Sequence, residues 1–73
     1  MYEEIIIQKL KSERNKAGYT QEEVAEKTGI PRTMLAKIKT GKQRPDAETI
    51  GKLAEFYCVS TDWLFGIGKK REE

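Results

Sequence analysis

Apolar side chains recur at intervals of three and four residues along the whole chain, and this period constrains the fold more than any other feature. Residues three and four apart lie on one face of an α-helix, so each segment can bury an apolar stripe. No stretch alternates between apolar and polar residues for long enough to form a strand. The chain is therefore predicted to be all-α. The apolar positions are Ile6, Leu10, Ala17, Val24, Ala25, Leu35, Ile38, Ile50, Leu53, Ala54 and Tyr57.

Glycine, proline and capping residues divide this pattern into five short helices. Gly18 and Gly29 are placed to end the first two helices, because glycine accepts the left-handed conformation that closes a helix. Thr20, with Glu23 three residues later, forms a capping box before the second helix. Pro31 favours the start of the third, because proline is tolerated in a first turn. The expected helices span about residues 2–17, 21–28, 32–39, 47–57 and 61–65, with Asp46 and Ser60 as caps of the last two.

The length of the chain and its cysteine and histidine content limit what it can do. A chain of 73 residues is long enough for one domain with one core and too short for two. We expect the domain to cover residues 1–66 and a charged tail to follow at 67–73, frayed over the charged run 69–73. With no histidine and one cysteine, the chain cannot assemble a thiolate or imidazole metal cluster or a histidine-based catalytic pair. Enzymatic activity and a cofactor are not expected, and Cys58 is expected to be a small buried apolar residue.

Basic residues concentrate in the middle of the chain. Residues 27–45 contain six lysines and arginines and no acidic residue, although the net charge of the whole chain is only +2. A local positive surface of this kind attracts a polyanion. The apolar run Ile5, Ile6 and Ile7 is much shorter than a signal-peptide core or a membrane span. We therefore expect a cytoplasmic protein with no membrane partner.

The second and third expected helices, with the turn between them, have the spacing of a helix-turn-helix. Each helix is about two turns long, and Gly29 lets the chain swing the second across the first. Val24, Leu35 and Ile38 supply apolar side chains for the contact between them. Such a unit holds its basic second helix at the surface, and a helix has the right width for the major groove of DNA.

These residues resemble the signature of the phage repressor and Cro-type (Xre-like) helix-turn-helix family. The resemblance covers residues 6–66 and implies an all-α, five-helix, lambda-repressor-like domain. It also implies a homodimer that binds double-stranded DNA at a pseudo-palindromic operator and regulates transcription, by repression. The matching residues are Arg14, Gly18, Thr20, Gln21, Glu22, Glu23, Val24, Ala25, Gly29, Ile30, Leu35, Ile38, Gly41, Lys42, Pro45, and Val59 to Leu64.

The resemblance also implies which residues touch DNA. Side chains on one face of the third helix would meet base edges, and residues around them would grip the sugar-phosphate backbone. The expected base contacts are Arg32, Thr33, Ala36 and Lys37. The expected backbone contacts are Gln21, Lys39, Thr40, Lys42 and Arg44.

Two positions depart from the family pattern. Pro31 stands where the family usually has a serine or threonine cap, so the third helix loses a capping oxygen. Arg14 usually pairs with a glutamate near the end of the third helix, but Lys39 stands there in this chain. Arg14 must then find a backbone carbonyl or a glutamate of the second helix, or else face solvent.

Three consecutive large apolar residues, Trp63, Leu64 and Phe65, occupy the expected fifth helix. Core packing is their simplest role, but three consecutive residues of one helix cannot all point inward. At least one is expected at the surface, where an apolar patch commonly marks an interface. We therefore predict that these three residues form the homodimer interface. An alternative is an antitoxin-type or anti-repressor role, in which this surface binds a different protein and DNA binding is secondary.

Overall fold

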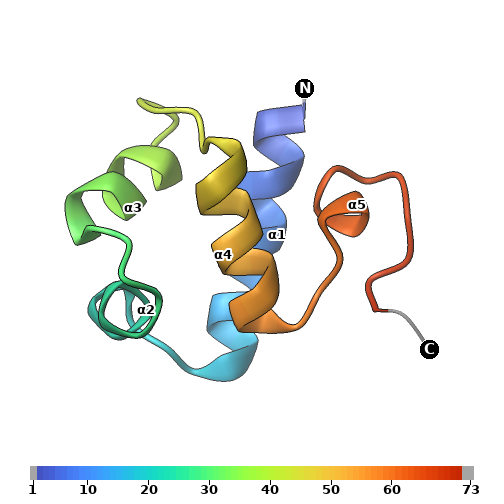
Figure 1. Cartoon of the computed structure of the whole chain (residues 1–73). Helices are drawn as coiled ribbons and strands as arrows, with labels where there is room; N and C mark the ends of the chain where they lie inside the picture. Colours follow the sequence, from blue (N-terminus) through green and yellow to red (C-terminus); the bar gives the residue numbers. More distant parts are fainter. Residues whose placement is uncertain (1, 72–73) are drawn as a thin grey trace.

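The structure is a computed structural model that describes residues 2–71 (Figure 1). Within that range the chain forms the five helices expected from the sequence and no strand, so the all-α prediction is confirmed. The fifth helix ends one residue earlier than expected, because Phe65 lies outside it as the cap. The helices are α1 (Tyr2–Ala17), α2 (Gln21–Thr28), α3 (Arg32–Lys39), α4 (Ala47–Tyr57) and α5 (Thr61–Leu64).

The boundaries of α2 follow from local hydrogen bonds. The Thr20 side chain accepts from the backbone N–H of Glu23 at 3.2 Å, and the Thr20 N–H donates to Glu23 Oε1 at 2.9 Å. These two bonds confirm the capping box. Gly29 closes the helix at φ 77°, and its N–H donates to the Ala25 carbonyl at 2.9 Å. The turn that follows directs the chain across α2 into α3.

Side chains cap the starts of α4 and α5, whereas α3 starts without a side-chain cap. Asp46 Oδ1 accepts from the Thr49 N–H at 2.8 Å, and Ser60 Oγ accepts from the Trp63 N–H at 3.0 Å. Both caps were expected from the sequence. Pro31 precedes α3 without any side-chain capping bond, as its side chain requires.

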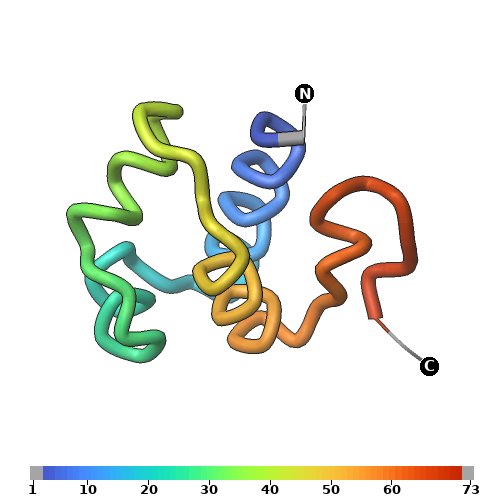
Figure 2. The backbone as a smooth tube through the Cα atoms, turned by 45° about the horizontal axis from the view of Figure 1, so that its top comes forward, coloured from blue at the N-terminus to red at the C-terminus, as the bar shows by residue number. Residues whose placement is uncertain are grey.

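The helices pack in an order that sets α3 apart from the fifth helix. Helices α1 and α4 lie side by side at the centre, with α2 and α3 on one side and α5 on the other (Figures 1 and 2). Helix α2 contacts α3 and α4, and α5 contacts α1 and α4. The helix-turn-helix therefore rests on the central pair, and its outer face is away from α5.

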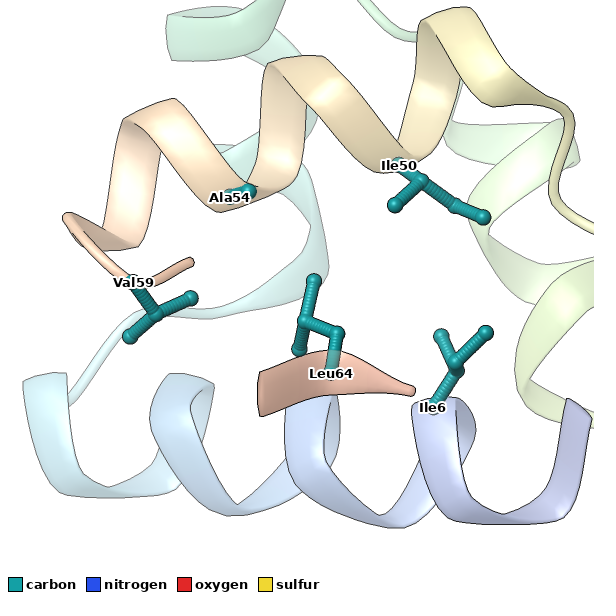
Figure 3. Packing of buried hydrophobic residues seen from close by; sticks show 5 residues of the cluster. All are labelled: Ile6, Ile50, Ala54, Val59 and Leu64. Carbon is teal, nitrogen blue, oxygen red and sulfur yellow. The ribbon is translucent and has the colours of Figure 1, made fainter. Parts of the chain in front are cut away.

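Two groups of buried apolar side chains form the core. Leu64, with no exposed surface, points from α5 into the space between α4 and α1, toward Ile50 and Ile6 (Figure 3). The second group joins α2, its turn and α4 through Val24, Ile30 and Leu53. Leu10 and Tyr57 pack against both groups. The helix-turn-helix and α5 are thus tied to the same two central helices.

The expectation that Cys58 is buried was wrong. Cys58 is exposed and caps α4 in the left-handed conformation, at φ 57°. The next residue, Val59, enters the core instead, and its N–H donates to the Ala54 carbonyl at 2.9 Å. The turn that ends α4 therefore directs Val59 inward and leaves the cysteine outside.

The expectation of a frayed tail was also wrong for residues up to 71. The Ser60 N–H donates to the Lys70 carbonyl at 2.7 Å, and its hydroxyl donates to the Lys69 carbonyl. Lys70 Nζ lies 2.9 Å from Oε2 of Glu13, a side chain of α1 that is 6% exposed. This segment is held against α1 and α5. Residues 72 and 73 lie outside the described range, and the expected domain boundary at residue 66 stays a prediction.

Candidate nucleic-acid interface

Helix α3 lies at the surface on an apolar inner face. Ile38 is 4% exposed, and the half-buried Leu35 packs against the buried Val24 and Ile30 of α2 and its turn. The contact is short, because α2 and α3 have eight residues each. This packing fixes the orientation of α3, so the other side of the helix faces outward.

The four residues expected to read bases lie together on that outward side. Arg32, Thr33, Ala36 and Lys37 are all exposed. Positions three and four apart are neighbours on a helix surface, so Ala36 adjoins both Arg32 and Thr33, and Thr33 adjoins Lys37. The four therefore form one continuous patch at the start and middle of α3. The structure brings these side chains together, and their contact with bases stays a prediction.

The five residues expected to grip the DNA backbone flank this patch. Gln21 is half-buried at the first position of α2, and Lys39, Lys42 and Arg44 are exposed at the end of α3 and beyond it. The Thr40 hydroxyl donates to the carbonyls of Ala36 and Lys37 at 3.2 Å each, so it helps to close α3. The Lys42 N–H donates to the Lys37 carbonyl at 2.9 Å, which fixes the start of the loop.

Two carboxylates within this surface were not expected from the sequence. Glu22 Oε1 of α2 lies 4.0 Å from Nε of Arg32, and Glu3 Oε1 of α1 lies 3.0 Å from Nε of Arg44. The sequence offered a hint that Glu22 lies within this surface, because it is in the first turn of α2, next to Gln21, an expected phosphate contact. No signal pointed to Glu3, which lies 41 positions before Arg44 in the sequence.

Arg14 uses one of the alternatives left open by the sequence. Its Nη1 donates to the Tyr19 carbonyl at 3.0 Å, so the backbone takes the place of the missing glutamate. Arg14 and Lys39 line the same small groove of about 60 Å³, which lies between helices α1 to α4, together with Lys11 and Gln21. Burial raises the pKa of the nearby Tyr57 hydroxyl to about 12, against the opposing charge of Arg14, so this tyrosine is neutral.

The structure narrows the surface expected to form a dimer. Leu64 has no exposed surface, so it belongs to the core and cannot contact another chain in this fold. Trp63 and Phe65 are half-buried, and their role in an interface stays a prediction. Lys9 Nζ lies 4.4 Å and Lys70 Nζ 5.1 Å from the centre of the Trp63 ring.

Apolar surface also remains beside α5. Ile67 is 67% exposed and Ile5 is 38% exposed. A Cβ built on Gly66 would lie 3.6 Å from a methyl group of Ile5, which places the start of α1 beside the turn after α5. No helix among residues 2–71 is long and apolar enough to cross a membrane.

An exposed basic helix packed on a capped partner helix is typical of helix-turn-helix proteins, and sequence comparison gives the same class. The sequence model of the helix-turn-helix family matches residues 10–64. The chain therefore belongs to the helix-turn-helix family, a class of DNA-binding regulators and not of enzymes.

Particular relatives carry the same designation. The HTH-type transcriptional regulator ImmR of Bacillus subtilis (strain 168) is 45% identical over 67 residues, which cover 88% of this chain and 53% of ImmR. The SPbeta prophage-derived uncharacterized HTH-type transcriptional regulator YonR of the same organism is 40% identical over 57 residues, 78% of this chain and 53% of YonR. An uncharacterized HTH-type transcriptional regulator of Methanocaldococcus jannaschii, MJ0272, is 35% identical over 57 residues and is covered to 86%. The chain spans about half the length of the two Bacillus regulators.

Proposed function

We propose that this chain binds an operator in double-stranded DNA as a homodimer and represses transcription in the cytoplasm by occupying promoter sequence. One observation carries the proposal. The outward patch of α3 exposes Arg32, Thr33 and Lys37, while Ile38 on the opposite side is buried and fixes the helix in place. A fixed, protruding basic helix is suited to the major groove, where each base pair presents a distinct pattern of donors and acceptors.

The side chains of the patch match different features of base edges. Arg32 can donate two parallel hydrogen bonds to O6 and N7 of guanine, and Lys37 can reach the same acceptors as a point charge. Thr33 offers a hydroxyl and a methyl group, and Ala36 can make only an apolar contact. Lys42 and Arg44 after α3 are suited to phosphates, which position the protein without reading sequence.

A homodimer is supported by the apolar surface around α5. Trp63, Phe65 and Ile67, in or just after α5, and Ile5, which lies beside Gly66, leave apolar area exposed in a small domain. Burying such a surface against its own copy would form an isologous interface with two-fold symmetry. The two copies of α3 would then lie about 34 Å apart, one turn of DNA, and the operator would be a pseudo-palindrome.

Selection of bound sequences from a random DNA pool tests the proposal in one experiment. The expected result is an enriched pseudo-palindrome whose half-sites lie one helical turn apart, bound by two copies of the chain in sedimentation. Enrichment of a single asymmetric site, bound by a chain that stays monomeric at high micromolar concentration, would refute the dimer. Absence of any enriched sequence would refute specific DNA binding. Repression is then measured with a reporter whose promoter contains the selected operator.

A further inference from the structure

The two arginines of the candidate interface that have acidic partners share one geometry. In both ion pairs the carboxylate approaches the guanidinium from its Nε side. A guanidinium has five N–H donors, and a carboxylate at Nε leaves the outer edge, formed by the two Nη groups, for another acceptor. The outer edge is the one that can donate two parallel bonds to guanine or to a phosphate.

We propose that Glu22 is a positioning residue that determines specificity, because it holds Arg32 so that the outer edge of its guanidinium faces a guanine. This inference rests on the proposed function, in which Arg32 reads a base. Arg32 is the first residue of α3, and its side chain is 65% exposed. A long side chain at such a position samples many directions in solution. The Glu22 side chain is itself 76% exposed, and its carboxylate, 4.0 Å from Nε, favours some of these directions over others through its charge.

The elements on either side of this ion pair are held firmly. Glu22 lies in the first turn of α2, where the reciprocal Thr20 and Glu23 bonds fix the backbone. Helix α3 is fixed by the buried Ile38. The 4.0 Å pair therefore joins two helices whose relative orientation is set by the core. An acceptor on a fixed helix can direct the arginine, as a supporting residue directs a binding side chain in other sites.

The charge of Glu22 and its geometry act on different quantities. A carboxylate at a surface that approaches phosphates is repelled by them, and the repulsion acts on every DNA sequence alike, so it lowers affinity without changing discrimination. At the correct base pair Arg32 lies between guanine and Glu22, and its guanidinium is already directed toward the base. At a wrong base pair the same orientation gains nothing. Glu22 therefore widens the difference in affinity between correct and incorrect sequences through Arg32 alone.

The second ion pair supplies a matched control. Glu3 contacts Arg44 through the same Nε atom at 3.0 Å, but Arg44 is 82% exposed in the loop after α3, where contacts are expected to phosphates only. Removing Glu3 deletes the same charge from the same side of a guanidinium. Its loss should change affinity for all DNA sequences together. Glu55, exposed on α4 with no role in the interface, controls for the change in net charge alone.

The test compares the whole chain with its Glu22→Gln, Glu3→Gln and Glu55→Gln variants on three duplexes. The duplexes are the selected operator, the same operator with the G·C pair read by Arg32 replaced, and random DNA. Glu22→Gln should lower the discrimination between the first two by about three- to tenfold and raise affinity for random DNA about twofold. Glu3→Gln should raise affinity for all three by a similar factor, and Glu55→Gln should match the unaltered chain.

A fourth variant, Arg32→Ala, separates failure of this inference from failure of the proposed function. In the Arg32→Ala background, Glu22→Gln should no longer alter discrimination, because Glu22 acts through Arg32. If Arg32→Ala discriminates as well as the unaltered chain, Arg32 reads no base. The base contact of Arg32 and the positioning role of Glu22 are then both refuted. A second outcome is that Arg32→Ala loses discrimination while Glu22→Gln changes the affinities for the operator and for the altered operator by the same factor. In that case Glu22 only neutralises charge, and its positioning role is refuted. Thermal unfolding of each variant confirms that the fold is retained.

Discussion

Single residues of α3 and of the loop after it are expected to contribute different kinds of affinity. Lys37→Ala should cost about 1–3 kcal/mol per half-site on the operator and much less on random DNA, because a base-edge hydrogen bond exists only at the right sequence. Lys42→Ala should weaken binding to all sequences alike and reduce the slope of log affinity against log salt by about one, since one phosphate contact is lost. Both lysines are exposed, so neither change should disturb the fold.

Binding isotherms of the two variants, on operator and random duplex at several salt concentrations, measure this difference. Ala36→Gly is unsuitable as a control because glycine weakens a helix, so the unaltered chain serves as reference. If Lys42→Ala relaxed the sequence preference while Lys37→Ala left it intact, the patch on α3 would have been assigned the wrong role.

Leu64 and Ile67 lie three positions apart in the sequence but in opposite environments. Leu64 has no exposed surface, whereas Ile67 is 67% exposed. Leu64→Ala should destabilise the chain by about 2–5 kcal/mol, because it removes buried methyl groups and leaves a cavity between α1 and α4. Ile67→Ala should change the free energy of unfolding by no more than about 0.5 kcal/mol. Urea unfolding measures both, and equal losses would mean that α5 is not packed as described.

Residue-level predictions from the sequence succeeded where periodicity decides burial and failed where a turn does. The spacing of Val24 and Ile38 correctly placed them on inner faces. Periodicity could not place Cys58, because the left-handed turn at the end of α4 reverses the direction of the side chain. It also could not choose which of three consecutive apolar residues is buried, and packing against two other helices selects Leu64.

At the scale of elements, the start and end signals of helices were readable because they depend on residues within four positions. The Thr20 capping box and the caps at Asp46 and Ser60 were all predicted and are all formed. The absence of a side-chain cap before α3 was also predicted, and Pro31 makes no capping bond. The partner of Arg14 was not fixed by sequence, because a carbonyl and a carboxylate were both within reach along the chain. Only the packed structure selects the Tyr19 carbonyl.

In the groove that Arg14 and Lys39 line, a substitution that stabilises the fold is expected to weaken DNA binding. Arg14 and Lys39 both line it, and none of its lining residues is acidic. Lys39→Glu would place a carboxylate beside Arg14 and should raise the free energy of unfolding by about 0.2–1 kcal/mol. The same change should weaken binding to every DNA sequence, because a phosphate contact becomes a repulsion.

Thermal unfolding and binding of Lys39→Glu are measured together, with Lys39→Gln as the control for loss of charge alone. Lys39→Gln should lose part of the DNA affinity and gain less stability than Lys39→Glu. A Lys39→Glu chain that is less stable than the Lys39→Gln chain would show that Arg14 cannot reach position 39.

At the scale of the whole molecule, the buried carboxylate of Glu13 joins the first helix to the last described residues. Lys70 Nζ lies 2.9 Å from it, Lys16 Nζ 3.6 Å and Arg71 Nη2 3.8 Å. Burial works to raise the pKa of Glu13, but close contact with Lys70 and the charges of Lys70, Lys16 and Arg71 outweigh burial and hold the pKa below its usual 4.5. Sequence patterns could not reveal this junction, because its partners are far apart along the chain.

Lys70→Met should therefore destabilise the chain in a manner that depends on pH. A carboxyl whose pKa is lowered on folding stabilises the folded state above its unfolded pKa of 4.5, and this contribution is lost as the pH falls through the folded value. Without Lys70, burial of the Glu13 charge is poorly compensated, and the variant should lose about 1–3 kcal/mol at neutral pH.

As the pH falls below the ordinary glutamate pKa of 4.5, the deficit of Lys70→Met should shrink, because Glu13 then binds a proton and its burial no longer requires a cation. A smaller loss should persist at every pH, since Lys70 also lies over the Trp63 ring. Lys16→Met, which removes a cation that is 65% exposed from the same carboxylate, should cost much less. Urea unfolding of both variants from pH 3 to pH 7 measures these differences. A deficit of Lys70→Met that is constant over this range would show that Lys70 acts through packing alone and that Glu13 does not hold the C-terminal segment against α1.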